Sequence, residues 1–161
     1  MAAQLPELTL QQPLLDRLID REPWTKLEAL PSRAQAVRAL KESIKRDLEW
    51  VLNTRKIEEE APKSMVELRH SLYHFGLLDM TSVRLLSVED EKMLLRSIET
   101  AIEFFEPRLK QVRVSSQEPL RKQERNLHFQ VDAMLMLDPA PEAISFDTYL
   151  DLTRGEYQVK A

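Results

Sequence analysis

The sequence contains no cysteine and only two glycines, Gly76 and Gly155. Without cysteine, the chain can form neither disulfides nor a thiolate zinc site, and it has no thiol nucleophile. A P-loop, a dinucleotide-binding fingerprint and the nucleophile elbow of hydrolases each need at least two glycines close together. Because the two glycines lie far apart, these three large enzyme classes are excluded.

The chain also lacks a basic excess and a long apolar run. Its formal net charge is −4, which disfavours a duplex nucleic-acid binder, since such proteins usually carry many more basic than acidic residues. No stretch approaches the roughly 20 apolar residues of a membrane span, and the N-terminus does not read as a secretion signal. A chain of 161 residues suits one domain, which we expect in the cytoplasm.

The first 30 residues read as an N-terminal arm, which the prolines at positions 6, 13 and 23 divide into short pieces and Pro31 ends. One piece, LLDRLID, carries four aliphatic side chains on one face, which are Leu14, Leu15, Leu18 and Ile19. These side chains favour docking on this protein or on a partner, because solvated tails rarely carry so many aliphatic residues. A frayed terminus is the alternative interpretation.

Three helical patterns follow the arm. Apolar residues of 32–56 recur in steps of three and four, which predicts a long helix with Ser32 as its N-cap. Residues 64–76 predict a shorter second helix, and residues 87–105 predict a third. In the first helix Trp50 lies near the apolar stripe, so we expect it in the core.

After Pro107 the apolar period changes from near 3.6 residues to two, which is typical of strands. The predicted strands are residues 110–116, 126–137, 144–152 and 156–160. Helices first and strands afterwards predict an α+β fold, with the N-terminal helices packed on one face of a C-terminal antiparallel sheet. We expect residues 31–161 to form this single domain.

The segment FFEPRL lies where the third helix ends. Pro107 stops the helix, and Glu106 and Arg108 then point the same way from an extended chain. They could present opposite charges to a partner, on a corner that the proline stiffens. The alternative is a helix stop with an internal salt bridge, for example from Arg108 to an acidic residue of the third helix, and the residues alone favour this alternative.

Two groups of titratable residues raise the question of catalysis or metal binding. One is Glu67, His70 and His74, which would share a face of the second helix but lack the spacing of a zinc protease motif. The other is Glu99, Glu103 and Glu106, which would line one solvated helix face, whereas a glycosidase needs two carboxyls facing each other across a cleft. We therefore predict neither a metal site nor a catalytic residue.

Three segments occur in order along the chain: KESIKRDLEWVLNTR (41–55), YHFGLLDMTS (73–82) and IEFFEPRLKQVRV (102–114). Together they resemble the TssE family, the small baseplate wedge subunits of bacterial type VI secretion systems, which are similar to a wedge protein of contractile phage tails. The resemblance spans about residues 13–160. Leu78 departs from it, because the family pattern has a proline there.

The resemblance implies a non-enzymatic subunit of the cytoplasmic baseplate that needs no cofactor. It implies TssF, TssG and TssK as partners, together with the first layer of the TssB–TssC sheath. Nucleic acid would not be bound, and a membrane would be contacted only indirectly, through the larger apparatus. The family's Glu-Pro-Arg motif falls on Glu106, Pro107 and Arg108, which the resemblance places against the helical core bundle of the wedge.

The resemblance also assigns a sheath contact to the C-terminal strands, which are similar to the strand-exchange unit of the sheath. The residues expected there are Phe146, Tyr149, Leu150 and Tyr157. An open edge of the last hairpin would accept a strand from another chain, unless that edge is covered or too short. Two other functions stay open, a regulatory anti-adaptor on the same fold and a peptidoglycan hydrolase, and both are disfavoured.

Overall fold

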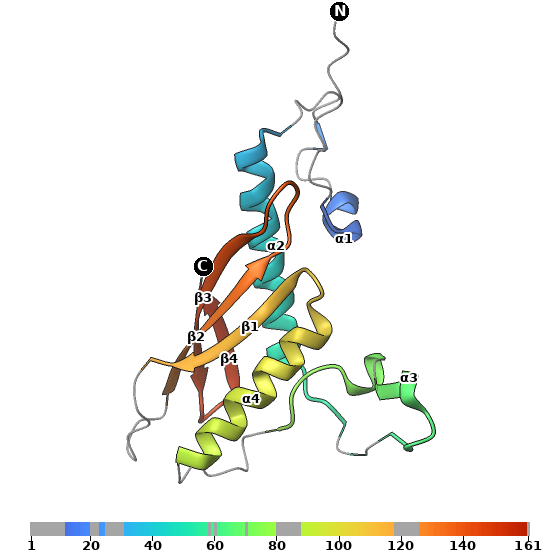
Figure 1. Ribbon diagram of the computed structural model, residues 1–161, viewed down its shortest axis with the longest axis vertical. Coiled ribbons are helices and arrows are strands. Elements are labelled where there is room, and N and C mark those ends of the chain that lie inside the picture. Colours follow the sequence, from blue (N-terminus) through green and yellow to red (C-terminus); the bar gives the residue numbers. More distant parts are fainter. Residues whose placement is uncertain are drawn as a thin grey trace, which may run out of the picture.

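The computed structural model describes residues 12–19, 23–24, 31–57, 59, 61–69, 71–79, 88–117 and 126–160. Among the described residues all helices precede the strands, and one antiparallel sheet with strand order β1-β2-β3-β4 forms the C-terminal end (Figure 1), which confirms the α+β prediction. The elements are α1 (Leu14–Leu18), α2 (Arg33–Asn53), α3 (Val66–Arg69), the short 3₁₀ helix η1 (Leu72–His74), α4 (Val88–Phe105), β1 (Leu109–Ser116), β2 (Asn126–Leu135), β3 (Glu142–Asp151) and β4 (Glu156–Lys160).

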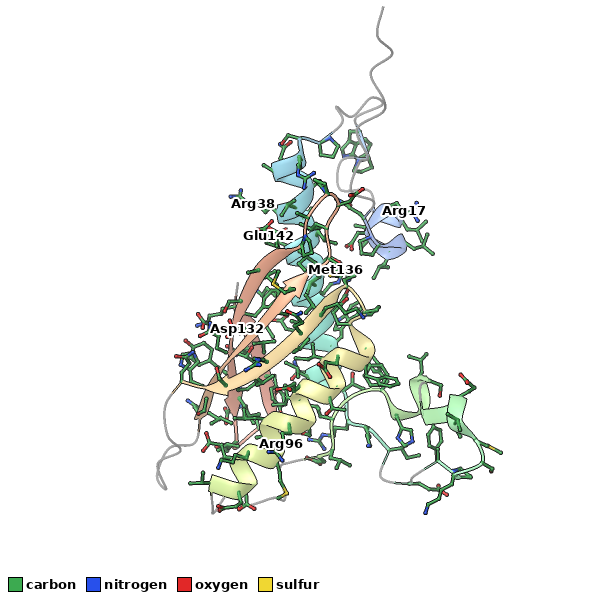
Figure 2. The ribbon with its side chains drawn as sticks, viewed as in Figure 1. Arg17, Arg38, Arg96, Asp132, Met136 and Glu142 are labelled. Atoms are coloured by element: carbon green, nitrogen blue, oxygen red, sulfur yellow. The ribbon has the colours of Figure 1, made fainter. Side chains whose placement is uncertain are left out.

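One face of the sheet is buried and the other is open. Along β2, buried residues such as Phe129 and Val131 alternate with half-buried polar ones, as a sheet covered on one side requires. α4 packs beside β1 and α2 beside β4, and both contribute to a single apolar core. Lys41 of α2 also pairs at 2.6 Å with Glu142 at the start of β3, and Glu142 is labelled in Figure 2.

The long helix α2 forms as its sequence predicts. The Ser32 hydroxyl accepts the backbone N–H of Gln35 at 3.3 Å, and the Gln35 side chain accepts the backbone N–H of Ser32 at 2.8 Å. This reciprocal capping box satisfies donors at the helix start that would otherwise have no partner. Within the described part of the chain, no helix is both long and apolar enough to cross a membrane.

The predicted second helix is wrong, because the structure has two short pieces there, α3 and η1. At Ser71 the backbone is extended, and the hydroxyl donates to the Leu68 carbonyl at 2.8 Å while accepting the Tyr73 N–H at 3.2 Å. These local bonds compete with the helical ones. Leu72 is 81% exposed, so its side chain does not contribute to the core.

Gly76 then turns the chain back toward the end of α2. Its φ is +103°, and the Leu77 N–H donates to the Thr54 carbonyl at 2.9 Å. A Cβ at position 76 would lie 2.2 Å from that same carbonyl oxygen. Only glycine allows both this conformation and this close approach.

β1 carries an irregularity that moves its side chains off strict alternation. Gln111 has a φ of 54°, and the register with β2 shifts between Lys110 and Arg113. The extra residue is typical of a β-bulge, which lets both Leu109 and Val112 reach the core. The sequence pattern alone predicts a regular strand here.

Candidate functional site at the corner after α4

The corner begins where α4 ends. The Glu106 N–H makes the last helical hydrogen bond, to the Ile102 carbonyl at 2.9 Å, and Pro107 then prevents further helix. Glu106 turns inward and is only 3% exposed, whereas Pro107 lies at the surface. A carboxylate this deeply buried needs a charged partner close by.

Arg108 is that partner. Its Nε donates to Glu106 Oε1 at 2.6 Å, its Nη2 donates to Glu106 Oε2, and its backbone N–H lies 3.3 Å from Oε1. The planar guanidinium thus binds the carboxylate with two prongs. Burial opposes the charge of Arg108, but the hydrogen bonds and charges of Glu106 and Asp47 outweigh it and raise the arginine's pKa.

α2 supplies the other side of the corner. Arg108 Nη2 donates to Asp47 Oδ2 at 2.5 Å, and Nη1 donates to the Ser43 hydroxyl at 3.2 Å. Ser43 and Asp47 are four residues apart, so they share one helix face. An internal salt bridge therefore exists, as the alternative interpretation predicted, but the second acidic partner lies on the first long helix and not on the third.

Further ion pairs connect Asp47 to the N-terminal helix α1. Arg46 donates to Asp47 Oδ1 at 3.0 Å and to both oxygens of Asp16, at 2.6 and 3.2 Å. The hydrogen bond from Arg46 is the main cause that lowers the pKa of Asp16. The piece LLDRL thus docks on its own protein through a charge, while its aliphatic residues stay outside.

An open groove of about 620 Å³ lies between α1, α2 and the corner. Its apolar lining residues include Pro13, Leu14, Trp50, Phe75, Phe105 and Pro107. Asp47, Glu106 and Arg108 add charged groups to the lining, and so does Arg17 of α1, which is labelled in Figure 2. A groove with apolar walls and a few fixed polar groups suits a partner segment of the same character.

Trp50 is 53% exposed, so its predicted place in the core is wrong. Leu48, Val51 and Leu52 fill the buried side of α2 at this level, which leaves position 50 on the flank. The Arg46 guanidinium lies 5.2 Å from the centre of the indole ring and supports it from one side. Together with Leu14 of α1, which is also exposed and lines the groove, Trp50 gives the groove an apolar rim.

The four residues expected to contact the sheath do not share one surface of the C-terminal strands. Phe146, Leu150 and Tyr157 are buried in the core, so their side chains hold the sheet together and are not available to a partner. Tyr149 lies on the open face, where it stacks on His128 at 4.3 Å, and the Lys160 ammonium lies 4.5 Å from its ring centre. The outer edge of β4 is covered by α2 side chains, as the alternative to an open edge predicted.

The other titratable groups do not gather as the patterns suggested. Glu67 is on α3 and His74 on η1, His70 lies outside the described residues, and no cluster able to hold a metal occurs in the part described. Glu99 accepts the Val114 N–H at 3.2 Å and Glu103 is exposed. Because Glu106 is buried, the expectation that the three glutamates line one solvated face is wrong.

A comparison with protein families finds one that matches the region around this corner. Residues 38–140, more than half of the chain, match the family described as baseplate wedge protein gp25. The matched region contains most of α2, all of α4 and the whole Glu106–Arg108 corner. No curated protein matches the chain. The chain therefore belongs to the gp25 baseplate wedge family, whose members have a structural role in phage-tail-like baseplates.

Proposed function

We propose that this chain is the wedge subunit of a type VI secretion baseplate and acts in the cytoplasm without catalysing a reaction. It would bind the wedge core formed by TssF, TssG and TssK at the corner groove. It would bind the first layer of the TssB–TssC sheath through its C-terminal strands. The family supports the baseplate role, and the resemblance of the three quoted segments supports the secretion system.

The observation that carries the proposal is the buried Glu106 carboxylate, which holds Arg108 in place beside an open groove. Arg108 binds both oxygens of Glu106, so this carboxylate holds the arginine in a fixed position. The corner is consequently a rigid binding surface, in which the charges of Glu106, Arg108 and Asp47 are already paired with one another. A partner helix would gain affinity mainly from the apolar rim, with Pro107 and the accessible part of Arg108 setting its position.

The sheath contact involves a different part of the molecule. β3 and β4 form a hairpin whose buried side chains anchor it to the core, so a sheath strand would meet its backbone and its open face. Main-chain pairing would supply the affinity, and accessible residues such as Tyr149 would set the register. The corner and the hairpin could then be occupied at the same time by two partners.

Retention by purified TssF–TssG tests the core contact. Trp50→Ala removes the largest exposed side chain of the groove rim, and we expect affinity to fall about tenfold or more. Trp24→Ala is the matched control, because Trp24 is 94% exposed and does not line the groove. Equal retention of wild type and Trp50→Ala, with both proteins folded, would contradict the proposed contact.

A further inference from the structure

The outer edge of β4 is occupied by two side chains of α2. Asn53, the last residue of the helix, accepts the Tyr157 N–H on its Oδ1 at 2.9 Å. Its Nδ2 donates to the Tyr157 carbonyl at 3.0 Å. Four residues earlier, Glu49 Oε1 accepts the Val159 N–H at 3.2 Å.

These backbone groups are the ones that a fifth strand would use. In a strand, alternate residues direct their N–H and C=O groups to opposite edges. Tyr157 and Val159 direct theirs toward α2, which is the side away from β3. The Asn53 side chain presents its carbonyl oxygen and an N–H donor to Tyr157, as a backbone peptide group would, and so imitates one residue of a neighbouring strand. The same Nδ2 also donates to the Glu49 carbonyl of its own helix, at 2.9 Å.

We propose that Asn53 and Glu49 form an edge lock, which keeps β4 closed until an incoming strand of the sheath displaces both side chains. This inference rests on the proposed sheath contact and identifies the edge and the residues that control it. The partner is an extended segment recognised through its main chain. Before assembly, the lock would stop β4 from pairing with the edge of another molecule.

The arrangement allows the lock to open while the strand stays in place. Asn53 is exposed and Glu49 half-buried, so water can replace their hydrogen bonds when they swing away. The Tyr157 and Val159 side chains are buried in the core and hold β4 against β3. An incoming strand would replace the three side-chain bonds with main-chain bonds to the same groups.

Amide hydrogen exchange tests the lock without any partner. In Asn53→Ala, we expect the Tyr157 amide to exchange about tenfold faster or more, while the Phe129 amide at the sheet centre keeps its rate. Glu42→Ala is the control, because Glu42 is an exposed residue of the same helix. An unchanged Tyr157 rate in Asn53→Ala would overturn the lock, since the side chain would then not be what protects this amide.

Binding to purified TssB–TssC sheath tests the consequence. Because the wild-type edge must open first, we expect Asn53→Ala to bind roughly tenfold more tightly. Asn53→Asp, which keeps the acceptor and loses the donor, should gain less than that, and Glu42→Ala should gain nothing. Equal or weaker binding by Asn53→Ala, with the faster Tyr157 exchange observed, would overturn the inference. If wild type and Asn53→Ala both fail to bind sheath, the proposed sheath contact is wrong instead.

Discussion

Asp47 Oδ2 lies 2.5 Å from Arg108 Nη2, although 61 residues separate the two along the chain. This contact fixes the corner after α4 to the middle of α2. The other oxygen of Asp47 binds Arg46, which itself holds Asp16 of α1. Through Asp47 and Arg46, the N-terminal segment, the long helix and the Glu-Pro-Arg corner are therefore connected.

Removing the arginine at the corner should weaken the fold as well as any contact. Arg108→Ala would leave Glu106 buried without its charged partner, and we expect the free energy of unfolding to fall by about 2–4 kcal/mol. The side chain of Arg108 is 25% exposed, so the loss should stay below that of a fully buried pair. Urea unfolding followed by circular dichroism measures the change.

Arg108→Lys separates charge from geometry at the same position. Lysine keeps the positive charge but lacks the planar fork that binds both oxygens of Glu106, so we expect an intermediate loss. If Arg108→Ala unfolds at the same urea concentration as wild type, the pairing does not stabilise the corner. The corner would then be less rigid than the contacts indicate.

Gly76→Ala should destabilise the protein by about 3 kcal/mol or more. The new Cβ would lie 2.2 Å from the Thr54 carbonyl oxygen, and the φ of +103° at residue 76 is unfavourable for alanine. Gly155→Ala is the comparison, because its φ of +67° lies in the left-handed region, and we expect a loss of about 1 kcal/mol there. Thermal unfolding of the two variants should rank them in that order, and the reverse order would contradict this account of the turn.

Acid should release α1 from α2. The pKa of Asp16 is lowered in the folded protein, chiefly by its hydrogen bond from Arg46. The bond therefore contributes its full stability above about pH 4, the range of a free aspartate, and loses it as the pH falls through the lower folded value. A carbon-detected NMR titration of the Asp16 carboxyl should show a midpoint below that of an unpaired aspartate.

Asp16→Asn provides the control for this pH effect. The asparagine side chain carries no charge and cannot replace the carboxylate in the ion pair with Arg46. The backbone N–H signals of α1 should therefore show the released state already at neutral pH, and they should change little on acidification. An Asp16 midpoint at the ordinary value would mean that Arg46 does not hold α1 in solution.

Much of this architecture can be predicted from the sequence pattern. The steps of three and four in α2 and α4, and the alternation in β2 and β3, report which side chains face the core. Ser32 as a cap follows from its side chain and position alone. These features depend on neighbours within a few residues, which is why periodicity captures them.

The site depended on contacts between distant segments, and there the sequence was a poorer guide. Asp47 stands in the quoted segment RDLEW, but nothing local indicates that it faces Arg108 rather than solvent. Asn53 likewise bonds β4, more than a hundred residues away. Trp50 and the second helix were mispredicted because tertiary packing and the Ser71 hydroxyl overrode the local pattern.

We expect the groove at the Glu106–Arg108 corner to receive the core of the wedge. A photo-crosslinking amino acid placed at Trp50 tests it most directly in assembled baseplates, with the same substitution at Trp24 as the matched position. We expect a covalent adduct with TssF or TssG from position 50 and little or none from position 24. Position 50 left uncrosslinked in baseplates that contain this protein would contradict it.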